Sequence, residues 1–265
     1  MTQRQIKQLL IALTFAIGLL LWSTMIHAQL LWTYPEEGIS KTTVDKNIWV
    51  FKIDQKEYTF KAVGNQDNIK TLPEWAKWYD GGINLNMWGL GYLPMGYTKI
   101  NNKVIQPEIR KDYNGFIVWN KDTLLILDKY KDGLEAIMKW PNISQNIRTI
   151  IEEGKRNRWQ IDQKKWSVAM LAVTTDGYVL FIHSREPYTM HNFIDILLNH
   201  KELKIYRAVY LEGGPESSIA IYGHFSRPLK PHQLGNQRMG SYETGYYEYY
   251  DNTKFQNIPW ALVFY

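Results

Sequence analysis

A hairpin signal in the second half of the chain constrains its fold most strongly. Two apolar runs, residues 168–173 and 178–182, flank the tetrapeptide Thr-Thr-Asp-Gly that ends at Gly177. An Asp-Gly pair between such runs is typical of a tight turn between antiparallel strands, because these residues accept the positive φ that the turn requires. The sequence therefore predicts an antiparallel strand pair here.

Much of the remaining chain repeats this pattern of short apolar runs separated by turns. Residues 47–53 and 58–63 indicate one hairpin about an Asp-Gln-Lys turn, and residues 116–119 and 123–127 indicate another. Further strands are expected at residues 83–88, 208–211, 219–222 and 258–265. Residues 142–155 are ambiguous, because their isoleucines have helical spacing while residues 149–155 also resemble a strand and a turn.

Helical signals are fewer. Residues 72–79 predict a short helix with Pro73 in its first turn. Thr189 precedes apolar residues at i, i+3, i+4, i+7 and i+8, which predicts a capped helix that packs on the sheet and ends near Lys201. The predicted fold class is α+β, a single domain of mostly antiparallel sheet with a few packed helices.

Residues 207–223 concentrate polar groups between two of the expected strands. The polar segment contains Glu212, Gly213, Gly214, Pro215, Glu216, Ser217 and Ser218. Glycine has no side chain to keep a ligand away, so the two glycine amides could face an anionic oxygen beside the carboxylate and the hydroxyls. The alternative is a hairpin whose Gly-Gly-Pro turn faces water. This stretch alone leaves both interpretations open.

The N-terminus has the order of a secretory signal. A polar, basic segment is followed by the almost wholly apolar residues 9–22 and by small residues before a cleavage point expected after Ala28. We therefore expect an exported protein, periplasmic or secreted. Its expected parts are a signal peptide (1–28), an extended lead-in (29–46) and one domain (47–265). An uncleaved membrane anchor is the alternative, because the apolar run is nearly long enough to cross a thin bilayer.

Charge and cysteine content exclude several classes of function. The chain has 31 Lys and Arg against 26 Asp and Glu, and its basic residues form no stripe with interleaved aromatics, so nucleic acid is not an expected partner. The absence of cysteine excludes disulfides and thiolate metal sites. The six histidines are scattered, so we expect no metal or cofactor, although an oxygen-ligand Ca²⁺ site stays open.

The order of short blocks resembles the phosphodiester glycosidase family, which includes the catalytic domain of the lysosomal uncovering enzyme and exported bacterial proteins. The family carries Ile-Asn-Gly-Gly-Met-Phe before a Pro-x-Gly segment, and later Gln-Ser-Gly-Pro, an Asp-Gly hairpin, Leu-Asp-Gly-Gly-x-Ser-Ser and Val-Pro-Asn-Ala. The corresponding segments here are 83–88 with 94–96, 145–148, the hairpin at Gly177, 211–218 and 258–261. The resemblance covers roughly residues 47–265, and it favours a strand at 149–152.

The departures from the family pattern fall on polar positions. Glu212 stands where the family has Asp, and Leu85 and Asn86 stand where it has small residues. The arginine usual before the Asp-Gly hairpin is matched only by Lys164 or Lys165. An ammonium is a point charge whereas a guanidinium holds phosphate through two parallel hydrogen bonds, so this exchange is not conservative. The framework is thus better preserved than the polar site.

The resemblance implies an exported hydrolase that cleaves a sugar-1-phosphodiester at its glycosidic side, in envelope or extracellular glycans. Glu212 would be the acid, base or nucleophile, and Asn84 would hydrogen-bond the substrate. The residues expected to hold phosphate or sugar are Gly213, Gly214, Ser217, Ser218, His183, Arg185 and Lys165. The expected partner is a glycan or sugar phosphate, and the membrane would be reached only through the N-terminal signal or anchor.

Structural roles are the alternative for several of these residues. Asn84 could cap a turn, His183 could be a satisfied residue at a strand end, and Arg185 could pair with Glu186. The tyrosines of the tail could stack on sugar rings or pack on the sheet; they are Tyr242, Tyr246, Tyr247, Tyr249 and Tyr250. At the level of function, the alternative is a catalytically inactive glycan-binding or envelope-scaffold protein on the same fold.

Overall fold

The computed structural model describes residues 30–157, 159, 163–222, 237–242 and 255–265, so the predicted signal peptide lies outside the described residues. Residues from Trp32 to Tyr265 form one unit. Within the described ranges, none of the helices has the length and hydrophobicity needed to cross a membrane.

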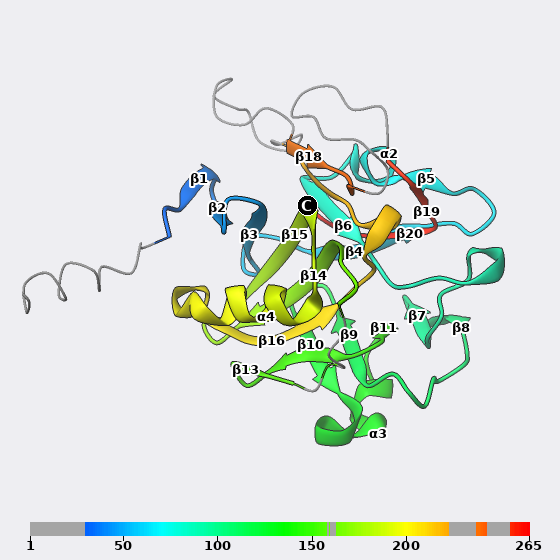
Figure 1. Ribbon diagram of the computed structural model, residues 1–265. Helices are drawn as coiled ribbons and strands as arrows, with labels where there is room; N and C mark the ends of the chain where they lie inside the picture. Colours follow the sequence, from blue (N-terminus) through cyan, green and yellow to red (C-terminus); the bar gives the residue numbers. More distant parts are fainter. Residues whose placement is uncertain (1–29, 158, 160–162, 223–236, 243–254) are drawn as a thin grey trace, which may run out of the picture. The chain divides into compact units, whose positions relative to one another are not determined.

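An eight-stranded sheet is the largest element (Figure 1), with the strand order β1-β2-β3-β15-β14-β16-β12-β13. Its strands are β1 (Thr33–Glu36), β2 (Ile39–Val44), β3 (Ile48–Asp54), β12 (Thr149–Glu152), β13 (Lys155–Arg156), β14 (Trp166–Thr174), β15 (Tyr178–Tyr188) and β16 (Ile205–Tyr210). The Asp-Gly hairpin is its centre, since β14 pairs with β15 from Trp166 opposite Tyr188 to Val173 opposite Val179. The predicted hairpin and the strand at 149–152 are confirmed.

Two five-stranded sheets and a strand pair complete the β-structure. The first has the order β10 (Leu124–Asp128), β9 (Gly115–Trp119), β11 (Asn142–Asn146), β7 (Thr98–Ile100) and β8 (Lys103–Gln106). The second has the order β18 (Gln237–Met239), β17 (Ile219–Ile221), β6 (Gly81–Asn84), β20 (Trp260–Phe264) and β4 (Phe60–Gly64), and β5 (Lys70–Thr71) pairs with β19 (Asn257–Ile258). The paired strands β9 and β10 confirm the second predicted hairpin.

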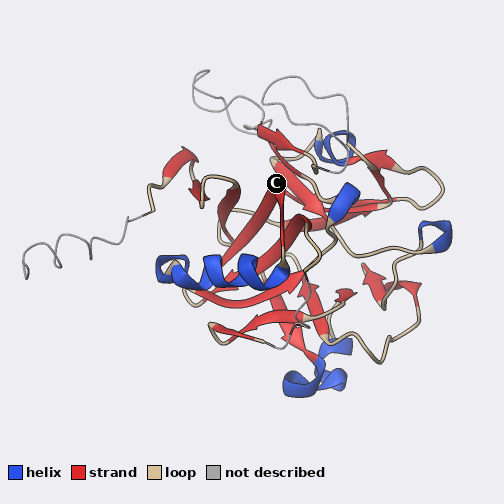
Figure 2. Cartoon of the chain, in the orientation of Figure 1, coloured by secondary structure: helices blue, strands red, loops and turns tan. Residues whose placement is uncertain are grey.

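The helices of the described residues are short, and strands dominate Figure 2. They are α2 (Leu72–Ala76), η1 (Leu90–Tyr92), η2 (Lys129–Gly133), α3 (Leu134–Met138), α4 (Met190–Asn199), η3 (Lys201–Leu203) and η4 (Gly214–Glu216). Thr189 caps α4 as predicted, since its hydroxyl accepts from the Asn192 N–H at 3.3 Å. The antiparallel pairing of the described strands and the few helices confirm the α+β prediction.

Side-chain alternation places the main core on one face of the eight-stranded sheet. Ala169, Leu171 and Phe181 turn into an apolar cluster with residues of both five-stranded sheets, and the rings of Phe181 and Phe264 meet at 5.5 Å. The other face is also buried, for example at Met170 and Ile182. α4 turns its apolar stripe to this second face, and its Phe193 ring meets that of Tyr188 at 5.8 Å.

Two predictions about strand limits and pairing need correction. Residues 47–53 and 58–63 do not form a hairpin, because β3 pairs with β2 and β15 whereas β4 pairs with β20 in another sheet. The expected extended lead-in contains β1 and β2, which join the main sheet. The strand expected at 83–88 is displaced: β6 covers Gly81–Asn84, and Asn86 has a φ of 51° that ends the extended conformation.

Candidate active site

Residues 211–218 carry the chain from one sheet to another. β16 ends at Tyr210 in the eight-stranded sheet, and β17 begins at Ile219 beside β6 in a five-stranded sheet. β16 and β17 do not pair with each other. The simple hairpin alternative is therefore wrong, and the polar segment connects the eight-stranded sheet to a five-stranded sheet. We call residues 211–218 the crossing segment.

Asn84, the last residue of β6, holds both ends of this segment. Its Nδ2 donates to the carbonyl of Glu212 at 3.1 Å, and its Oδ1 accepts from the N–H of Ser218 at 3.1 Å. The side chain is 2% exposed. The amide that the sequence suggested for substrate binding is thus engaged in fixing the backbone that carries Glu212.

We expect Asn84→Ala to lower the free energy of unfolding by about 2 kcal/mol, because a buried carbonyl and a buried N–H lose their partner. Asn65→Ala is the matched control, because the Asn65 side chain accepts from the Asp67 N–H at 2.8 Å in an exposed turn. Urea denaturation of both variants measures the difference. Equal losses would show that the Asn84 amide does not hold the crossing segment.

The carboxyl group of Glu212 is mostly buried. Burial raises its pKa from 4.5 to about 9, the negative charge of Glu216 acts in the same direction, and the adjacent main chain of Trp88 opposes both. Within the described part of the chain, Oε2 of Glu212 has no hydrogen-bond partner. Glu212 is therefore protonated at neutral pH and is suited to donate a proton.

The raised pKa of Glu212 has a consequence for stability. Between pH 4.5 and about 9 the folded protein retains a proton that the unfolded chain releases. Stability should therefore fall as pH rises through this window, by at most about 1.4 kcal/mol per pH unit. Denaturation at about pH 6 and about pH 8 should show a steeper loss for the wild type than for Glu212→Gln. Parallel pH profiles would contradict the raised pKa.

The two glycines of the crossing segment have different tasks. A Cβ on Gly213 would lie 2.3 Å from Cδ1 of Trp166 and 2.5 Å from the Tyr210 hydroxyl oxygen. Burial raises the pKa of Tyr210. Gly214 instead has a φ of 71° with open space around it. Position 213 therefore leaves no room for a side chain, and the phosphate role expected of the Gly213 amide stays a prediction.

His183 is buried beside Ser217, a residue of the crossing segment that is also fully buried. Burial lowers the pKa of His183 to about 3, and the adjacent main chain of Ser217 only partly opposes this. The imidazole is therefore neutral, and it does not supply the positive charge suggested from the sequence. Among the described residues, neither ring nitrogen of His183 nor the Ser217 hydroxyl has a partner with hydrogen-bonding geometry. Ser218 has one, because its hydroxyl donates to the Glu216 carbonyl at 3.1 Å.

Arg185 lies at the rim of the crossing segment. Its carbonyl accepts from the Ser167 hydroxyl, which also accepts from the Tyr242 N–H at 2.8 Å. Its guanidinium is 5.9 Å from the centre of the Tyr242 ring and 3.3 Å from Glu186. Ser241, next to Tyr242, donates to the Pro215 carbonyl at 3.2 Å, which connects this rim to the crossing segment.

Lys165 precedes β14 and is exposed. The predicted role of the other tail tyrosines, Tyr246, Tyr247, Tyr249 and Tyr250, falls outside the described residues.

Comparison with known proteins identifies the family. A model of the phosphodiester glycosidase family matches residues 75–242, which is more than half of the chain and includes Asn84 and the whole crossing segment. The chain belongs to the phosphodiester glycosidase family. No curated protein matches the sequence.

Two solved structures share the fold of this chain. A hypothetical protein from Synechocystis is similar with a TM-score of 0.62 at 12% identity, over 90% of this chain and 64% of that one. The zebrafish N-acetylglucosamine-1-phosphodiester alpha-N-acetylglucosaminidase catalytic domain, auto-inhibited by its pro-peptide, is similar with a TM-score of 0.54 at 10% identity, over 88% and 80%. The chain thus spans less than two thirds of the Synechocystis protein.

The structure shows the setting of two departures from the family's sequence motifs. It also shows neighbours of Glu212 that the sequence did not indicate. Asn86 adopts left-handed backbone where the family has glycine, and Asn tolerates this conformation better than most residues. Pro215 and Glu216 occupy the place of one residue between Gly214 and Ser217, which brings a second carboxyl close enough to influence Glu212. The nearness of the Trp88 main chain to Glu212 leaves no signal in the sequence, because it arises only when the two segments fold together.

Proposed function

We propose that this phosphodiester glycosidase hydrolyses a sugar-1-phosphodiester of envelope or extracellular glycans at the bond between the anomeric carbon and oxygen. The observation that carries the proposal is the protonated Glu212, which Asn84 anchors in a crossing segment within the matched region. A neutral carboxyl in a partly desolvated site is a general acid at neutral pH.

In the proposed reaction, Glu212 gives its proton to the departing bridging oxygen while water adds to the anomeric carbon. The carbon–oxygen bond breaks, the phosphate leaves as a phosphomonoester, and the proton of the attacking water goes to a base. Glu216 is our candidate base, because it is the other carboxyl of the crossing segment and its charge reaches Glu212. Activity should fall as the pH rises through the pKa of Glu212, near 9.

Arg185 is our candidate for the positive charge that binds the substrate phosphate. Its carbonyl accepts from the Ser167 hydroxyl at this rim, and a guanidinium can hold a phosphate through two parallel hydrogen bonds. His183 is neutral, and its buried position beside Ser217 supports a role in shaping the site. The Ser217 hydroxyl, which has no partner among the described residues, is fully buried beside His183, so we assign Ser217 to the same role.

Export is part of the proposal, on the basis of the basic, apolar and small-residue order before residue 29. The expected partner is a glycan or sugar phosphate. The alternative function is an inactive glycan-binding or scaffold protein on the same fold.

The test is release of free sugar from a panel of sugar-1-phosphodiesters at several pH values, with and without Ca²⁺. Release of both a sugar and a phosphomonoester from at least one substrate supports the hydrolase. A folded protein that binds glycans and releases no sugar from any substrate would favour the binding function.

A further inference from the structure

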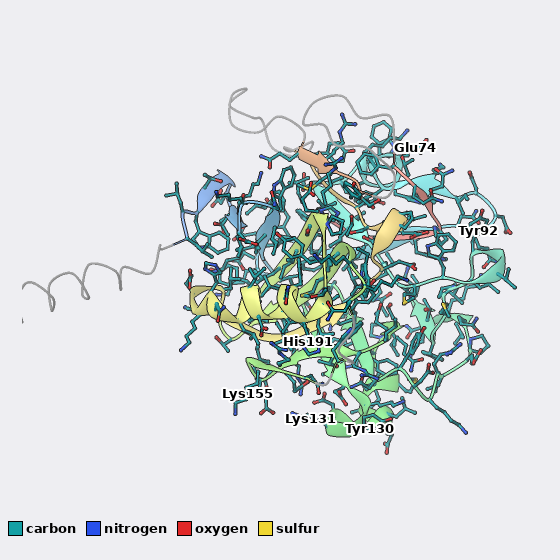
Figure 3. All side chains as sticks on the ribbon, in the orientation of Figure 1. Glu74, Tyr92, Tyr130, Lys131, Lys155 and His191 are labelled. Carbon is teal, nitrogen blue, oxygen red and sulfur yellow. The ribbon has the colours of Figure 1, made fainter. Side chains whose placement is uncertain are left out.

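An exposed loop adjoins the proposed site. After β6, residues 87–95 form a narrow turn, closed by the Met95 N–H donating to the Met87 carbonyl at 2.8 Å and the Gly89 N–H donating to the Leu93 carbonyl at 3.0 Å. η1 lies at the outer end of this turn, and Figure 3 shows Tyr92 there, well separated from Tyr130. We call residues 87–95 the aromatic loop.

Two aromatic rings of this loop lie against each other. The ring centres of Trp88 and Tyr92 are 5.1 Å apart and their planes are inclined by 49°. Tyr92 is 37% exposed and Leu90, between them, is 99% exposed. The pair is therefore a partly exposed aromatic surface rather than part of the described core clusters.

The backbone of the loop is strained where it holds this pair. Gly91 and Tyr92 both have positive φ, 71° and 58°. Glycine accepts this conformation freely, whereas a residue with a Cβ is disfavoured there. Strain of this kind persists where the surrounding structure imposes it, and it is concentrated at binding and active sites. Position 92 thus carries a ring at a place where the backbone alone would favour glycine.

The aromatic loop touches the proposed catalytic group. Its main chain at Trp88 lies beside the Glu212 carboxyl, and Asn84, four residues before Trp88, donates to the Glu212 carbonyl at 3.1 Å. The loop that carries the Trp88 and Tyr92 rings thus starts next to the segment that holds Glu212.

We propose that Trp88 and Tyr92 form a stacking surface for a pyranose ring of the substrate, next to Glu212. Trp and Tyr combine a large apolar face with a polar edge, which suits the apolar C–H face and the hydroxyl rim of a sugar. The position of the reacting bond in this inference rests on the proposed function. The exposed Leu90 would also suit a membrane surface, but the contact between Trp88 and Glu212 favours the sugar.

The test separates sugar binding from turnover by using Glu212→Gln protein as background. Saturation-transfer NMR with glucose, galactose, mannose and N-acetylglucosamine should show transfer to the ring C–H protons of at least one sugar. Trp88→Ala keeps the main chain and should weaken the binding of that sugar about tenfold. Trp78→Ala removes a tryptophan that is 71% exposed elsewhere and should leave binding unchanged.

Tyr92→Gly distinguishes a binding role from a structural one. It relieves the positive φ, so it should weaken sugar binding severalfold without lowering the melting temperature. A lower melting temperature with unchanged sugar binding would overturn the proposal, and so would unchanged binding in Trp88→Ala. Absence of transfer to all four sugars, together with vesicle binding that Leu90→Ser abolishes, would assign the loop to a membrane surface instead. Sugar binding without hydrolysis would defeat only the proposed function.

Discussion

Glu212→Gln is expected to lower turnover by about 100-fold or more, the scale of a lost general acid. Gln has nearly the size of the protonated carboxyl that the folded protein holds, so the variant should fold normally. Turnover should therefore fall while the melting temperature stays unchanged, with both measured on the same preparation. If Glu212 is only a structural residue of the crossing segment, both quantities should change together or neither should change.

Two further variants sharpen this test. Glu212→Asp restores the residue usual in the family but shortens the reach by one methylene, so a site built around Glu should lose activity. Glu135→Gln is the matched control, because Glu135 is almost fully exposed on α3 and makes only a surface ion pair with Lys139. Full activity in Glu212→Asp and Glu212→Gln alike would remove Glu212 from the mechanism.

Gly213→Ala is expected to destabilise the fold by about 3 kcal/mol and to abolish activity, whereas Gly214→Ala should cost about 1 kcal/mol. The added Cβ at Gly213 meets Trp166, the Ser167 carbonyl and the Tyr210 hydroxyl, all within 2.5 Å. At Gly214 only the left-handed φ of 71° is unfavourable for alanine. Chemical denaturation of the two variants measures the difference.

Gly214→Asn provides the control for this pair. Asn tolerates left-handed backbone, so this variant should be closer to wild type than Gly214→Ala. Equal stability of Gly213→Ala and Gly214→Ala would contradict the packing described around Gly213.

Local signals predicted individual strands well but could not predict all their partners. The hairpin at Gly177 is confirmed because its two strands and its turn are adjacent in sequence. Residues 58–63 also form a strand, but β4 pairs with β20 at the C-terminal end of the chain. The short turn between residues 53 and 58 therefore led to a wrong prediction of strand pairing. The actual partner, β20, lies far away in sequence, and the burial that stabilises this pair does not show in local patterns.

The candidate site shows the same limit. The sequence indicates a carboxylate among glycines and hydroxyls near Glu212, but the roles of its neighbours depend on three-dimensional packing. Asn84 clamps the crossing segment, Gly213 makes room for three neighbours, and complete burial makes His183 neutral. These roles arise from contacts between elements far apart in the chain, and no residue spacing encodes them.

The most direct test of the central claim is hydrolysis of a sugar-1-phosphodiester in ¹⁸O-labelled water, with mass analysis of the phosphomonoester product. Cleavage between the anomeric carbon and oxygen leaves every original oxygen on the phosphate, so the phosphomonoester should contain no label. Phosphomonoester that carries ¹⁸O would show attack at phosphorus, and it would contradict the glycosidase mechanism that we assign to Glu212.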